Sequence, residues 1–132
     1  MPAVSPRVTV NIVNRNYPPY PGITGASAAE LADFLSMHGV AVNAIHVDAP
    51  YQPSGTAVTP AGTSYRVGTF YNGKNKFLRL FGNLYEAFRL VRQSRALAAD
   101  VTIYLTDPPF LNICAALLER GRSKWIFWSM DL

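Results

Sequence analysis

The chain has 132 residues, of which 49% are hydrophobic and 15% charged, a composition that suits one folded domain and excludes a disordered segment. Twelve Lys and Arg residues against eight Asp and Glu give a net charge of +4, which favours anionic partners such as nucleotides, phosphorylated lipids or nucleic acid. No apolar run approaches the roughly 20 residues that cross a bilayer, and the N-terminus lacks a secretory signal pattern. The single cysteine cannot form an internal disulfide, and no Cys or His cluster has metal-site spacing. We therefore expect one cytoplasmic domain over 1–132, without a metal centre.

The first third of the sequence predicts a strand, a helix and a second strand. A β-branched run at 7–14 is followed by a Pro- and Gly-rich loop at 17–25. Apolar residues then recur at helical spacing over 28–35, with Gly39 just beyond the expected end of the helix. A second strand at 40–47 completes a strand-helix-strand unit with the length of a right-handed crossover. This part of the chain is therefore predicted to be α/β.

The remainder continues the alternation of strands and helices. Three prolines and two glycines between positions 48 and 62 predict a loop rather than a regular element. The expected elements after it are a strand at 64–70, an amphipathic helix at 76–95, a buried strand at 101–106, a turn at 107–109, a helix at 111–120 and a last strand at 124–130. This order predicts a doubly wound, mostly parallel, Rossmann-like α/β sheet with helices on both faces.

The amphipathic helix at 76–95 allows more than one interpretation. Its apolar face is expected to cover the sheet and its polar face to point to solvent. The expected core face is Leu80, Phe81, Leu84, Ala87, Phe88 and Val91, and the opposite face Asn83, Glu86, Arg89 and Gln93. Basic residues between Lys74 and Arg95 alternate with aromatic ones, which also suits an anionic membrane surface or nucleic acid. The core-covering interpretation is favoured over membrane contact. No nucleic-acid partner is expected, because the core is expected to need the aromatic residues.

Ligands of open parallel sheets bind outside the carboxyl ends of the strands, so the segments that follow strands hold the candidate site residues. After the first strand, Gly22 and Gly25 would let the backbone approach a ligand closely, and Thr24 could cap the helix or bond a phosphate. An ordinary turn and helix cap explains the same residues equally well.

Three further candidates follow later strands. His46 ends the second strand without a visible acid or nucleophile partner, and a role away from substrate is favoured. Asp107 could position a substrate hydroxyl, although capping the next helix is the favoured interpretation. Asp131 could act as a base or orient a hydroxyl, or be an incidental surface charge. His38, in the last turn of the first helix, and Cys114, among apolar neighbours, are expected to be structural.

Three motifs occur in a recognisable order along the chain. They are the segment 14–25 with the helix after it, the segment 106–109 ahead of a helix, and the hydrophobic strand that ends in Asp131-Leu132. In this order they resemble the N-terminal domain of family four GT-B glycosyltransferases. The resemblance implies retaining transfer of a sugar from a nucleotide-sugar donor to a polysaccharide or lipid-linked glycan, with no metal ion or other cofactor. It also implies that the N-terminal domain holds the acceptor, and that a separate C-terminal domain holds most of the donor.

The resemblance carries over to individual residues. Gly22 and Gly25 match the Gly-rich loop that faces the donor phosphates, and Asp131 matches the acidic position on the acceptor side of the cleft. The paired glycines often seen in that loop are here separated, and His38-Gly39 reverses the usual Gly-His. Because the donor-binding domain is absent from these residues, the chain alone is expected to be inactive.

Two alternatives to this expectation concern the role and the location of the chain. It could be a non-catalytic nucleotide- or partner-binding Rossmann-like module or subunit. The expected location is cytoplasmic, with peripheral contact at the inner face of the membrane as the variant that the basic helix allows.

Overall fold

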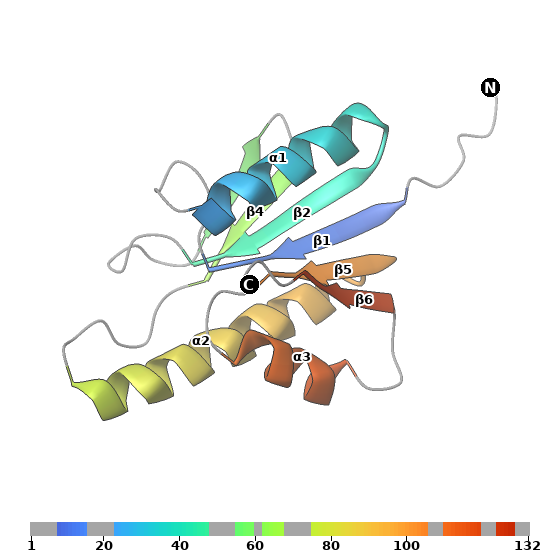
Figure 1. Cartoon of the computed structure of the whole chain (residues 1–132). Helices are drawn as coiled ribbons and strands as arrows, with labels where there is room; N and C mark the ends of the chain where they lie inside the picture. The colour runs from blue at the N-terminus through green and yellow to red at the C-terminus, as the bar shows by residue number, and fades with distance from the viewer. Residues whose placement is uncertain are drawn as a thin grey trace, which may run out of the picture.

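The computed structural model describes residues 8–15, 23–47, 55–59, 62–67, 75–105, 110–119 and 124–128. They form a six-stranded sheet with α1 on one face and α2 and α3 on the other (Figure 1). The strands are β1 (Thr9–Val13), β2 (Ala41–His46), β3 (Gly55–Thr59), β4 (Gly62–Arg66), β5 (Val101–Tyr104) and β6 (Lys124–Phe127). The helices are α1 (Ile23–Met37), α2 (Lys76–Ala96) and α3 (Leu111–Leu118).

The sheet order is β3-β4-β2-β1-β5-β6. Five neighbouring strands, from β4 to β6 in that order, run parallel, and β3 is antiparallel to β4. From β1 the chain builds outward through β2 to β4, then returns across the sheet through α2 to β5 on the other side of β1. The predicted doubly wound, mostly parallel Rossmann-like fold is confirmed. Its strand order reverses beside β1, the place where such sheets bind ligands.

The prediction of an unbroken loop between positions 48 and 62 is wrong, because β3 forms within it. The prolines of this stretch flank the strand and do not interrupt its interior, which is β-branched or small. β3 pairs with β4 in register, Gly55 opposite Arg66 and Thr59 opposite Gly62. Gly62 has a φ of +142°, and a Cβ at this position would lie 2.1 Å from the carbonyl oxygen of Val42. Only glycine lets the hairpin approach β2 this closely.

Two hydrophobic cores form, one on each face of the sheet. Side chains alternate between the faces along each strand, so Val10 and Ile12 of β1 pack under α1 while Asn11 points to α2. The core under α1 also contains Ala28, Ala32, Val42, Ala44 and Leu105. The core under α2 and α3 contains Val13, Ile45, Val47, Val67, Ala87, Leu90, Val91, Tyr104, Leu111, Cys114 and Ala115. The expected burial of Cys114 is confirmed.

Helix α2 buries a different face from the one expected. Ala87 and Val91 are buried as predicted, but Glu86, expected in solvent, is only 1% exposed. Four members of the expected core face, Leu80, Phe81, Leu84 and Phe88, are exposed. The apolar residues of α2 cover a wider arc than one contact with the sheet can bury, and its first turns extend past the strand ends (Figure 1). The core therefore does not account for these exposed Leu and Phe side chains.

Polar side chains tie α2 and α3 to the sheet. The amide of Asn43 donates to Asn11 Oδ1 at 3.0 Å, and the amide of Asn11 donates to the carbonyl oxygen of Ser94 at 2.8 Å. The hydroxyl of Tyr104 donates to Glu119 Oε1 at 2.8 Å, and its burial raises the pKa of this phenol. Buried amides and hydroxyls with partners add directional constraints that an apolar core lacks, so they fix how α2 and α3 sit on the sheet.

Candidate functional site

Charged and polar side chains gather where β1 and β2 end. Asn14 and Arg15 directly follow β1, and His46 is the last residue of β2. Glu86 reaches this edge from α2, and its carboxylate Oε2 lies 3.5 Å from Arg15 Nε. The Glu86 side chain is buried, whereas 36% of the Arg15 side chain is exposed. Arg15 therefore compensates a buried carboxylate, and part of its side chain remains exposed at this edge of the sheet.

The structure places His46 inside the protein. His46 is 3% exposed, and its Nε2 forms a hydrogen bond with the hydroxyl of Ser64 on β4. This contact joins the carboxyl end of β2 to the middle of the neighbouring parallel strand β4. This geometry does not test contact with a substrate, so the substrate-binding role of His46 stays a prediction.

Thr24 and Gly25 lie on a helix rather than in the predicted loop. Helix α1 begins at Ile23, so both residues belong to its first turn, which Figure 1 shows at the carboxyl ends of β1 and β2. The first N–H groups of a helix have no partner within the helix and point along the axis, which suits an anion. Gly22, the third residue proposed for this loop, lies outside the described residues.

The favoured capping role of Asp107 is wrong. The N-cap of α3 is Phe110, whose carbonyl oxygen accepts from the Cys114 N–H at 3.0 Å and whose φ is 72°. The Phe110 side chain makes no capping hydrogen bond. Phe110, with its left-handed backbone, precedes the first turn of α3. The helix therefore begins three residues later along the chain than it would with Asp107 as its N-cap. Asp107 and Asp131 themselves lie outside the described residues, and their roles at substrate stay predictions.

His38 has the structural role expected for it. Helix α1 ends at Met37, and His38 follows it in a turn, where its Nδ1 lies 2.8 Å from the carbonyl oxygen of Phe34. Its ring also lies 4.4 Å from the Phe34 ring, between centroids. Gly39 continues this turn with a φ of +80°, a conformation typical of a glycine that ends a helix.

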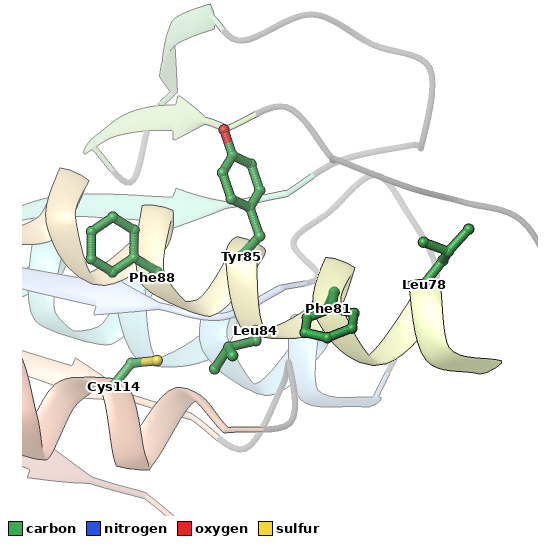
Figure 2. Close-up of a pocket in the computed structure, with 6 residues that line it drawn as sticks. All are labelled: Leu78, Phe81, Leu84, Tyr85, Phe88 and Cys114. Atoms are coloured by element: carbon green, nitrogen blue, oxygen red, sulfur yellow. The ribbon is translucent and has the colours of Figure 1, made fainter. Parts of the chain in front are cut away.

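A second candidate surface lies between α2 and α3. It is an apolar groove of about 740 Å³ that six residues line: Leu78, Phe81, Leu84, Tyr85 and Phe88 of α2, and Cys114 of α3. Figure 2 shows Leu84 and Cys114 pointing toward each other across it, while Tyr85 points away toward the strands. Burial raises the pKa of the Cys114 thiol, which disfavours the reactive thiolate. The groove is therefore suited to bind hydrocarbon rather than to perform chemistry.

The opposite flank of α2 is basic. A hollow of about 350 Å³ there is lined by Arg89, Arg92, Gln93 and Ala96, together with Val67 and the two aromatic residues Tyr85 and Phe88. The guanidinium carbon of Arg89 lies 5.7 Å from the centroid of the Tyr85 ring, within the range of a cation–π interaction. The sequence predicts this mixture of basic and aromatic residues. It does not predict how many of the aromatic side chains are exposed, because several of them are expected to face the core.

Neither a metal-binding cluster nor a membrane-spanning helix occurs among the described residues. No group of three or more His, Cys, Asp or Glu side chains there comes together as a metal site. Within the same residues, each helix is too short or too polar to traverse a bilayer.

No protein-family model matches the chain, and no curated protein matches its sequence. Among solved structures, the chain is similar to a sucrose-phosphate synthase from Thermosynechococcus elongatus, with a TM-score of 0.68 and 14% identity. That match covers 96% of this chain and 34% of the other. A second similar structure is described as trehalose-6-phosphate from E. coli bound with UDP-2-fluoro glucose, with a TM-score of 0.54 and 16% identity. It matches 90% of this chain and 32% of its own length, so the chain spans about a third of each protein. At these identities the likeness establishes a shared fold.

Proposed function

We propose that this chain is the acceptor-side domain of a retaining GT-B glycosyltransferase of family four. The observation that carries the proposal is that almost the whole chain matches one third of a sucrose-phosphate synthase in structure. The order of strands and helices in this match is also the order that the three motifs led us to expect. The parent enzyme would transfer a sugar from a nucleotide-sugar to a polysaccharide or a lipid-linked glycan, without a metal ion.

The carboxyl edge of the sheet supplies the proposed acceptor site. Thr24 and Gly25 stand in the first turn of α1 at this edge, where backbone N–H groups favour an anionic group of the substrate. Arg15 stands at the same edge with its side chain partly exposed and could hold a phosphate or a sugar hydroxyl. Asp131 would orient the acceptor hydroxyl or accept its proton, and Gly22 and Asp107 would line the same cleft.

Most of the nucleotide-sugar would bind to a second domain across this edge. In such an arrangement the present chain orients the acceptor, while the partner domain holds the donor phosphates. Each half then contributes one reactant, and the rate gain arises from holding both in the geometry of transfer. We accordingly propose that the 132 residues alone turn over no substrate.

The test compares the chain alone with the chain supplemented by its donor-binding domain, using a panel of nucleotide-sugars and glycan acceptors. We expect sugar transfer only from the combination, and Asp131→Asn should lower kcat by about a hundredfold or more. Robust transfer by the 132 residues alone would show that the site is complete without a second domain. No transfer from a folded combination, together with nucleotide or protein binding by the chain, would instead support the non-catalytic module.

A further inference from the structure

An exposed apolar ridge runs along α2. Phe77, Phe81, Leu84 and Phe88 are spaced at i, i+4, i+7 and i+11, which places them on one face of the helix. Phe77 is 76% exposed and Phe81 60%, and the other two residues are also exposed. The sheet is covered by a neighbouring face of α2, around Leu90 and Val91, so folding of the described residues leaves the ridge uncovered.

The same helix is strongly basic where it is accessible. The ridge continues at the same spacing into the exposed Arg92, and the exposed Lys76 and Arg79 flank its beginning. The only acidic residue of α2 is Glu86, which is buried beside Arg15, and α3 contains no charged residue. The ridge thus has cations at both of its ends, and neither helix has a solvent-exposed carboxylate.

We propose that α2 rests on an anionic lipid bilayer, with the ridge inserted among the acyl chains and the cations at the headgroups. Exposed aromatic and Leu side chains beside Lys and Arg are the composition of helices that lie in the membrane interface. The apolar groove of about 740 Å³ between α2 and α3 gives the acyl chains further surface to contact. A second copy of the chain fits less well, because pairing two such faces brings cations together. This inference is independent of sugar transfer.

The charge of the surface predicts its lipid preference. Vesicles of phosphatidylcholine with added phosphatidylglycerol should cosediment with the chain, and vesicles of phosphatidylcholine alone should bind it far more weakly. Binding should weaken between about 0.1 M and about 1 M NaCl, because the Debye length falls from about 10 Å to about 3 Å. Equal binding to neutral and anionic vesicles, or no binding to either at low salt, would overturn the proposal.

Two phenylalanines provide a matched pair of variants. Phe81 lies on the ridge, and Phe34 lies on α1, on the other face of the sheet, with a closely similar exposure of 58% (Figure 1). Phe81→Ser should weaken vesicle binding about tenfold, because it removes an inserted aromatic ring. Phe34→Ser should leave binding unchanged. Arg92→Gln should weaken binding to anionic vesicles about fivefold and have little effect at high salt. Equal losses for Phe81→Ser and Phe34→Ser would refute the assignment of the binding face.

A fluorescent probe reports insertion directly. Cys114 is the only cysteine, so Cys114→Ala combined with Phe81→Cys or with Phe34→Cys allows single-site labelling. A polarity-sensitive dye should shift to shorter wavelength with anionic vesicles at position 81 and not at position 34. If the ridge instead joins two copies, sedimentation equilibrium should show a dimer that Phe81→Ser dissociates and no dye shift with vesicles, which would reject the membrane proposal.

Discussion

The close approach of Gly62 to Val42 predicts a large cost for adding one methyl group. In Gly62→Ala the new Cβ would lie 2.1 Å from the Val42 carbonyl oxygen, whereas such carbon–oxygen contacts need at least about 3.3 Å. β4 or β2 would have to move by roughly 1 Å against its paired neighbour. Strain at a φ of +142° adds to this displacement. With about 1–3 kcal/mol for each effect, we expect a loss of about 2–6 kcal/mol in the free energy of unfolding.

Gly39 provides the control for this prediction. Its φ is also positive, +80°, but no atom lies within 4 Å of the position that a Cβ would occupy. Gly39→Ala should therefore cost only the conformational part, about 1–2 kcal/mol. Urea unfolding followed by circular dichroism and by the fluorescence of Trp125 and Trp128 measures both variants. Costs within about 0.5 kcal/mol of each other would refute the close approach of the hairpin to β2.

Further predictions concern the buried polar groups and the cysteine. Tyr104→Phe removes the donor to Glu119 and should cost about 1–3 kcal/mol at neutral pH. Burial raises the pKa of Tyr104, so the folded state holds the phenol proton more tightly than the unfolded state does. The free energy of unfolding of the wild type should therefore fall as pH rises above about 10. In urea titrations, Tyr104→Phe should show a smaller loss of stability over the same alkaline range. Arg15→Ala removes the cation that pairs with the buried Glu86 and should cost about 1–3 kcal/mol in the free energy of unfolding. This value is lower than for a fully buried ion pair, because the Arg15 side chain is partly exposed to solvent. A double-mutant cycle with Glu86→Gln that shows no coupling would contradict the ion pair. The Cys114 thiol should react with a thiol reagent far more slowly than free cysteine until urea unfolds the chain, and rapid reaction of the native protein would contradict its burial.

The sequence predicted the fold well because local signals and the fold agree. Short β-branched runs, helical spacing over 28–35 and Gly39 at a helix end all operate within a few residues of each other. The sequence does not predict β3, because prolines on both sides of a short segment are typical of a loop. The pairing of β3 with β4 also depends on the close contact of Gly62 with β2, which is a long-range feature. Breakers mark the ends of such a strand as readily as they mark a loop.

Contacts between distant parts of the chain limited the prediction of the site. Helical spacing showed that α2 is amphipathic but not which part of its apolar arc the sheet covers, so Phe81 was assigned to the core and Glu86 to solvent. Likewise, the pairing of Arg15 with Glu86 joins residues far apart in the sequence. His46 was correctly placed at a strand end, yet only the pairing of β2 with β4 brings Ser64 to its ring. Long-range register decides these contacts, and single-sequence patterns do not encode it.

The central position of β1 has a consequence for synthesis on the ribosome. β1 precedes the other described strands along the chain, but one of its two edges pairs with β5, in a register that joins Val10 to Val101. A nascent chain that already contains β2 to β4 therefore still exposes the other edge of β1. An unpaired edge of apolar, β-branched residues is a template for wrong association. Until β5 leaves the exit tunnel, we expect this edge to be where chaperones engage the growing chain.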